Sequence, residues 1–168
     1  MNPEEVSELF PLGSSSFHIF FRKKGGEIGF SGDNNYGPLG TGSSLDVIDI
    51  QTKKEIRGLK TSEIKTIVSN WFVFFLLTTK GEVFSTGTEG YSGHSENKLQ
   101  FTQLRFPEEK EILNISCSLY YTVFLTSQGH IYYCVEWNVQ QHSEFNPQKR
   151  SLWFRFSSFP AHNSRSQR

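Results

Sequence analysis

Residues 81–94 read Gly-Glu-Val-Phe-Ser-Thr-Gly-Thr-Glu-Gly-Tyr-Ser-Gly-His, and they restate residues 26–42, Gly-Glu-Ile-Gly-Phe-Ser-Gly-Asp-Asn-Asn-Tyr-Gly-Pro-Leu-Gly-Thr-Gly. The leading glycines, Gly26 and Gly81, stand 55 residues apart, and a weaker third copy begins 48 residues further on, at Gly129. A fixed period of about 50 residues is typical of repeat architectures, in which each repeat forms one structural unit. The sequence therefore predicts a chain built from repeated units.

Each copy predicts a β-hairpin. An apolar run rich in aromatic and β-branched residues comes before each leading glycine, and a second short run follows it. Two such runs around a glycine-containing turn are typical of paired antiparallel strands. A further strand is expected before the second and third hairpins, at residues 64–69 and 112–117, whereas the first copy offers only the weaker candidate 8–13.

Glycine-rich segments at residues 32–42 and 87–93 predict loops between the strands. Short strands at even spacing, with recurring glycine and aromatic positions, favour an all-β fold. We expect antiparallel blades of a partial β-propeller with about three degenerate repeats. A parallel β-solenoid is the alternative.

The copies also carry a family pattern. The unit resembles the regulator of chromosome condensation repeat, which reads roughly aliphatic-x-x-Ile-x-x-Gly-x-x-His-x-x-x-Leu-Thr-x-x-Gly-x-Val-Tyr-x-Trp-Gly-x-Asn-x-x-Gly-Gln-Leu-Gly. The resemblance implies a propeller whose complete form is a ring of seven blades. The matching positions are Gly32, Asn34, Tyr36, Gly37, Leu39 and Gly40 in the first copy; Ile64, Ile67, Leu77, Thr78, Gly81, Val83, Phe84, Gly87 and Gly90 in the second; and Ile112, Ile115, Leu125, Thr126, Gly129, Ile131 and Tyr132 in the third.

The repeats depart from that pattern at positions that bear on function. An aromatic residue replaces the family's histidine, and a small residue replaces its tryptophan. Gly-Gln-Leu-Gly survives only as Gly37-Pro-Leu-Gly40, and the third copy loses its loop glycines after Val135. The replacements are Phe17, Phe72 and Tyr120 for the histidine, and Ser31, Thr86 and Cys134 for the tryptophan.

The repeats suggest a division of the chain into a partial propeller, residues 1–148, and a basic, disordered tail, residues 149–168. Within the propeller we place repeats near 17–60, 61–111 and 112–148. The 168 residues are too few for a seven-bladed ring at this period, so open blade faces are expected. Three explanations of the open faces are left open: the sequence is part of a longer chain, the chain associates with itself to cover those faces, or it docks on a partner.

Charge gives no strong preference for a polyanionic partner. The chain has 17 basic and 17 acidic side chains, and a balanced chain has no overall field that attracts nucleic acid or membrane. The tail holds Lys149, Arg150, Arg155, Arg165 and Arg168 without an acidic residue. Any nucleic-acid contact is therefore expected to be weak and made through the tail.

No membrane or export signal is expected. Residues 1–5 are acidic, unlike the start of a signal peptide. The longest apolar run, residues 71–77, is too short to span a bilayer, and it predicts a strand buried on both faces. We expect a cytoplasmic or nuclear chain in which Cys117 and Cys134 are reduced, buried thiols.

The sequence predicts no catalytic residues, no cofactor and no metal site. The histidines, residues 18, 94, 130, 142 and 162, are scattered, and no Cys-x-x-Cys occurs. Neither a nucleophile elbow nor a phosphate-binding loop is present. The chain is therefore expected not to be an enzyme and to have no small-molecule substrate.

With catalysis not expected, the sequence favours a binding function, and binding residues are expected on loops carried by a rigid β-scaffold. The candidate contacts are Asp33, Asn34, Asn35 and Tyr36 in the first loop and Glu89, Tyr91 and His94 in the second. In the alternative interpretation the two tyrosines pack back onto their own blades.

The leading hypothesis for function is a non-enzymatic protein–protein interaction module. The resemblance implies the alternative of a guanine-nucleotide exchange factor, or a fragment of one, for a small Ran-like GTPase, with chromatin association. A non-functional truncated product is the third interpretation.

Overall fold

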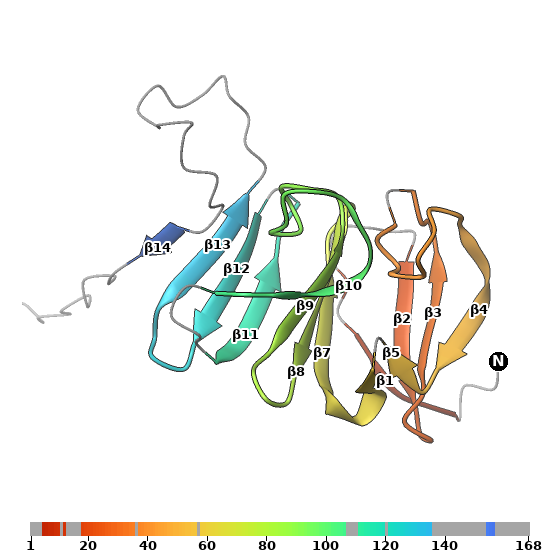
Figure 1. Cartoon of the computed structure of the whole chain (residues 1–168). Coiled ribbons are helices and arrows are strands. Elements are labelled where there is room, and N and C mark those ends of the chain that lie inside the picture. Colours follow the sequence, from red (N-terminus) through yellow and green to blue (C-terminus); the bar gives the residue numbers. More distant parts are fainter. Residues whose placement is uncertain are drawn as a thin grey trace, which may run out of the picture.

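Three antiparallel four-stranded sheets stand side by side in the computed structural model, which describes residues 5–10, 12, 18–35, 37–56, 58–106, 111–119, 121–135 and 154–156 (Figure 1). We call them the first, second and third blade. Since every strand pairing is antiparallel, the predicted partial propeller is confirmed and the parallel solenoid was wrong. The described part of the chain contains no helix long and apolar enough to cross a membrane.

The second blade is the most regular. It consists of β7 (Ile64–Ser69), β8 (Val73–Thr78), β9 (Val83–Gly87) and β10 (Lys98–Leu104), in the order β10-β9-β8-β7. Gly81 turns the chain from β8 into β9 at a φ of 78°, with its amide donating to the Thr78 carbonyl at 3.1 Å. The hairpin and the strand before it therefore form as the repeated pattern predicts.

The first blade contains a strand that precedes the predicted start of the first repeat. Its order is β1-β2-β3-β4, with β1 (Val6–Leu9), β2 (His18–Lys23), β3 (Ile28–Gly32) and β4 (Val47–Lys53). The strand β1 overlaps the weak candidate at residues 8–13 and completes the sheet. Its burial is low, which explains why no apolar pattern marks it.

A short connection joins the first two blades. It is a two-stranded ribbon of β5 (Glu55–Ile56) and β6 (Leu59–Lys60), followed by a 3₁₀ turn at Thr61–Glu63. Arg22 anchors this turn, because its guanidinium donates to the Thr61 and Ile64 carbonyls at 2.6 and 2.7 Å.

The third blade uses a strand from the predicted tail. Its order is β11 (Ile112–Cys117), β12 (Tyr121–Thr126), β13 (Ile131–Val135) and β14 (Phe154–Phe156). The rest of the tail lies outside the described residues, so the division at residue 148 stays a prediction.

Two apolar layers hold the blades together. One lies between the first and second blades and includes Phe20, Phe30 and Phe74; the other lies between the second and third and includes Phe75 and Phe124. Every residue of β8 is buried, which confirms the strand predicted to be covered on both faces. Complete burial of side chains of this size contributes about 1.5–3 kcal/mol each.

Candidate partner-binding site

Asn34 is an interior residue of the first loop. It is fully buried, and its side-chain oxygen accepts from the Leu39 amide at 2.9 Å. Its side-chain nitrogen lies 2.8–3.0 Å from the Thr41 hydroxyl and the Ser43 and Leu45 carbonyls. This candidate contact therefore holds the loop together and presents no side-chain surface to a partner.

The neighbours of Asn34 lie closer to solvent. Asp33 is half-buried, and its backbone oxygen accepts from His18 Nε2 at 2.6 Å. Burial lowers the pKa of His18, although Asp33 and Asp46 oppose that shift. Asn35 is exposed, and Tyr36 lies outside the described residues.

In the second loop Tyr91 also packs inward. It is 7 % exposed, and its ring stacks on Phe72 with centroids 4.7 Å apart. Its backbone oxygen accepts from Cys134 Sγ of the third blade at 3.2 Å. Tyr91 therefore matches the alternative in which the tyrosine packs on its own blade, since Phe72 precedes β8.

The other two candidates of the second loop differ in exposure. Glu89 is exposed, and its backbone amide donates to Asn97 Oδ1 at 2.8 Å. His94 is half-buried, and burial, with the nearby charge of Lys98, lowers its pKa. A neutral imidazole is therefore favoured at this position.

The first loop lies against the second blade. Gly42 donates its amide to the Leu99 carbonyl at 2.7 Å, and the Thr86 hydroxyl donates to the Gly37 carbonyl at 2.9 Å. Gly37 has a φ of 75°, and a Cβ there would lie 2.4 Å from Leu99 Cδ2 and 3.0 Å from Leu99 Cα, so a larger residue would be strained and would displace Leu99. The loop edge of the first two blades is consequently one continuous surface.

An open cleft of about 550 Å³ lies at this junction. Asn35 and Ser44 line it from the first loop, and Asn97 and Leu99 line it from the second blade. The lining offers two amides, a hydroxyl and an exposed leucine, which suit hydrogen bonds and an apolar contact with another protein. Of the predicted contacts only Asn35 takes part.

Sequence reasoning missed Ser44, Asn97 and Leu99. A position-specific signal did exist: Gly37 and Gly42 predict a close approach of two backbones. The sequence does not tell which strand makes that approach, because the strand begins 56 residues after Gly42, at Lys98.

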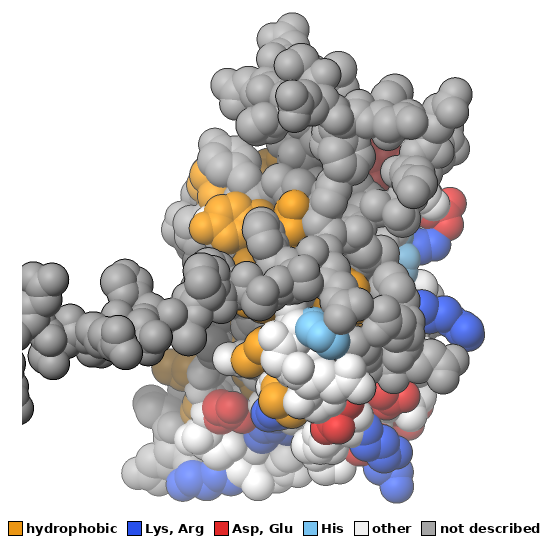
Figure 2. Space-filling view, turned by 90° about the vertical axis from the view of Figure 1, so that its left-hand side faces the viewer, with side chains coloured by type: hydrophobic (Ala, Val, Ile, Leu, Met, Phe, Trp, Pro, Cys, Tyr) orange, Lys and Arg blue, Asp and Glu red, His pale blue; other side chains and the backbone are white. Residues whose placement is uncertain are grey.

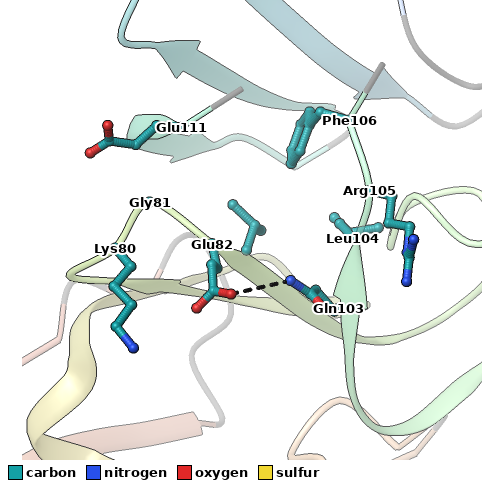
Figure 3. Close-up of a pocket in the computed structure, with 9 residues that line it drawn as sticks. Lys80, Gly81, Glu82, Gln103, Leu104, Arg105, Phe106 and Glu111 are labelled. Carbon is teal, nitrogen blue, oxygen red and sulfur yellow. Dashed lines mark hydrogen bonds between the residues drawn. The ribbon is translucent and has the colours of Figure 1, made fainter. Parts of the chain in front are cut away.

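A second cleft, of about 520 Å³, lies where the second blade meets the start of the third (Figure 3). Glu82 and Gln103 point toward one another across it, with Gln103 Nε2 3.5 Å from Glu82 Oε1, and Lys80 and Arg105 lie to either side. The lining carries cations and carboxylates but no histidine, cysteine, serine or threonine. It therefore lacks the paired nucleophile and base of acyl-transfer sites.

Comparison with curated proteins identifies distant relatives. The chain is 25 % identical over 105 residues to the ultraviolet-B receptor UVR8 of Arabidopsis thaliana, covering 60 % of this chain and 23 % of the receptor. It is 29 % identical over 107 residues to the secretion-regulating guanine nucleotide exchange factor of Bos taurus, covering 61 % of this chain and 23 % of that protein. The chain therefore spans less than a quarter of each relative. No protein-family model matches it.

Comparison with solved structures gives the same fold. Prp20p of Saccharomyces cerevisiae, the yeast RCC1, superposes with a TM-score of 0.57 and 21 % identity, covering 80 % of this chain and 32 % of Prp20p. That structure was described together with the binding properties of Prp20p to Gsp1p and histones. At this identity the likeness concerns the fold. It confirms the resemblance and the partial propeller predicted from the repeats.

Proposed function

We propose that this distant relative of the regulator of chromosome condensation repeat proteins is a non-enzymatic module that binds a protein partner through the edge formed by its loops. The observation that carries the proposal is the cleft between the first loop and the second blade, lined by Asn35, Ser44, Asn97 and Leu99. Rigid β-scaffolds commonly present binding residues on loops of this kind.

The chemistry of the cleft defines the kind of contact. Asn35 and Ser44 are exposed, and Leu99 is 39 % exposed. Since none of the lining side chains is charged, the partner is expected to be recognised by hydrogen bonds and one apolar contact, with little dependence on salt. Binding of this type needs neither cofactor nor metal, and we place it in the cytoplasm or the nucleus.

Paired arginine substitutions test the site. The variant Asn35→Arg/Ser44→Arg fills the cleft with charge at two exposed positions, and Thr79→Arg/Gln128→Arg adds the same charge at exposed turns of the second and third blades. Affinity capture followed by mass spectrometry is expected to recover proteins that the cleft variant loses and the control retains. Equal recovery by the two variants would contradict the proposed site.

Guanine-nucleotide exchange is the second candidate, with chromatin association as its implied setting. It is supported by the curated relative that is itself an exchange factor and by the description of Prp20p with Gsp1p. An exchange factor stabilises the empty GTPase, so it needs a complementary surface and no nucleophile. The chain spans only part of these proteins, and the proposal therefore concerns this part alone.

Release of fluorescent GDP from a small Ran-like GTPase measures that activity. Exchange predicts release that accelerates in proportion to the concentration of the chain and slows again in Asn35→Arg/Ser44→Arg. Unchanged release at high chain concentration would exclude exchange by these residues and leave the interaction module as the function.

A further inference from the structure

Successive side chains of the strand β8 point alternately toward the two neighbouring blades. In β8, Val73, Phe75 and Leu77 belong to the layer shared with the third blade, whereas Phe74 and Leu76 belong to the layer shared with the first. Successive side chains of a strand point to opposite faces of its sheet. Each blade therefore has a trailing face, toward the next blade, and a leading face, toward the previous one.

The third blade leaves its trailing face open. Counted from the leading glycines, Tyr121, Val123 and Leu125 stand where the second blade has Val73, Phe75 and Leu77. Those three residues of the second blade are fully buried, but Tyr121 is 50 % exposed and Leu125 is 39 % exposed.

Further apolar residues extend this trailing face. Ile131 pairs with Leu125 across β12 and β13 and lies on the same face. Figure 2, which views this end of the molecule, shows hydrophobic side chains gathered on the surface. We define the open trailing face as the exposed Tyr121 and Leu125 together with the half-buried Val123 and Ile131.

The first blade leaves its leading face open. Ile19 stands where the second blade has the buried Phe74, yet it is 51 % exposed. Leu9 is 72 % exposed, and it pairs with Phe21, which lies on the same face as Ile19 but is itself fully buried, so this face is open around Leu9 and Ile19 and covered at Phe21. In β4 the buried Val47 belongs to the layer shared with the second blade, so Ile48 and Ile50 point to the opposite, leading face. They are 89 % and 42 % exposed.

We propose that the open leading face of one copy of this chain packs on the open trailing face of a second copy. Both layers inside the chain join the trailing face of one blade to the leading face of the next. The chain therefore displays both halves of a contact that it already builds twice. Exposed apolar sheet faces of this kind mark protein interfaces.

The geometry of the contact is head-to-tail, since two different surfaces meet. Such an interface closes into a ring if its rotation permits and otherwise continues as an open assembly. Two copies bring six four-stranded blades together, and propellers close with about 4–8 blades. We therefore expect a closed dimer.

Complementation between variants tests the proposal. The trailing variant is Tyr121→Lys/Leu125→Lys, the leading variant is Ile19→Lys/Ile48→Lys, and the control is Leu45→Lys/Gln128→Lys. All six positions are exposed, so the folds are expected to survive, which circular dichroism and thermal melting verify. Analytical ultracentrifugation of the chain of residues 1–168 then gives the mass of each species.

The wild type and the control are expected at twice the monomer mass, and each single-face variant at the monomer mass. An equimolar mixture of the two variants is expected to form dimers again, because the intact leading face of one meets the intact trailing face of the other. A wild type that precipitates while both variants stay soluble and pair on mixing also supports the contact, as an assembly that does not close.

Three results would overturn the proposal: a monomeric wild type at high concentration, association that persists in either single-face variant, or variants that do not pair on mixing. The first would leave a different protein, or further blades of a longer chain, as the cover of these faces. The cleft variant Asn35→Arg/Ser44→Arg is expected to keep the dimer mass, so this test and the test of partner binding can fail independently.

Discussion

The Thr86 hydroxyl of the second blade lies 2.9 Å from the backbone oxygen of Gly37 in the first loop, 49 residues earlier in the chain. The third blade repeats this relationship, since Cys134 Sγ lies 3.2 Å from the backbone oxygen of Tyr91 in the second loop. Thr86 and Cys134 occupy equivalent repeat positions, where the family pattern has tryptophan. A small hydrogen-bonding side chain at this position thus fastens the second and third blades each to the loop of the blade before it.

Thr86→Val tests this fastening. Valine keeps the shape of threonine and suits a strand, but it removes the hydroxyl, whose one proton is shared between the Gly37 and Lys98 carbonyls at 2.9 and 2.7 Å. We expect the free energy of unfolding, measured in urea, to fall by about 1 kcal/mol, the usual net contribution of a hydrogen bond. The same substitution at the exposed Thr52 is the control and is expected to change stability by less than about 0.5 kcal/mol. Equal effects at the two positions would contradict the role of Thr86.

Asn34→Asp replaces a buried donor with an acceptor of the same shape. The new oxygen would face the Ser43 and Leu45 carbonyls, which now accept from the Asn34 nitrogen at 2.8 and 3.0 Å. Leaving such groups unsatisfied typically costs about 1–3 kcal/mol, so we expect a lower melting temperature. The exposed neighbour Asn35 provides the control Asn35→Asp, which is expected to melt like the wild type. A melting temperature unchanged in Asn34→Asp would show that the loop does not depend on this side chain.

The fold was largely predictable because its strongest signals are local. Gly81 and Gly129 mark hairpin turns, and the apolar run at residues 71–77 encodes β8, so period and composition suffice for both. The strand β1 was predicted only weakly, by the candidate at residues 8–13 that overlaps its end, since its side chains are mostly exposed and carry no alternating pattern. The strand β14 pairs with β13 across an interval of 18 residues, and no local feature of the sequence encodes that pairing.

The candidate site was less predictable, because loop composition does not reveal burial. Asn34 and Asn35 are adjacent and identical in type, yet one is fully buried and the other exposed. Their difference depends on contacts with Thr41, Ser43 and Leu45 that form only when the loop closes. Leu99 enters the cleft through the packing of the first loop on β10, a tertiary contact without a local sequence signal.

The two thiols are expected to be unreactive in the folded chain. Burial raises the pKa of both Cys117 and Cys134 to about 12, and the thiolate is the reactive form. Ellman's reagent at pH 8 should therefore titrate neither thiol in the native state and both in denaturant. Cys134 is buried as expected, whereas Cys117 is half-buried. Rapid reaction of the folded chain would contradict the raised pKa values.

The same pKa shifts predict a loss of stability in alkali. For an acid whose pKa is higher in the folded state, the folded chain holds more protons between the two pKa values, so stability falls as pH rises. The window runs from the ordinary value of 9.0 to about 12. Urea unfolding across this range should show a shallower decline for Cys117→Ala/Cys134→Ala than for the wild type, and parallel curves would contradict the shifts.

Gly40 and Gly90 separate the two reasons for which a loop needs glycine. Both have positive φ, 68° and 78°, but a Cβ at Gly40 would lie 2.6 Å from the Phe101 ring, whereas nothing lies within 4 Å of a Cβ at Gly90. Gly90→Ala should therefore lower the free energy of unfolding only by the cost of a left-handed backbone conformation in alanine, about 1–2 kcal/mol. Gly40→Ala must also displace Phe101, which is buried in the layer between the first two blades, and is expected to lose clearly more. Equal losses in urea unfolding would mean that the loop moves away from β10 at little cost, and the surface shared by the first loop and the second blade would then not be rigid.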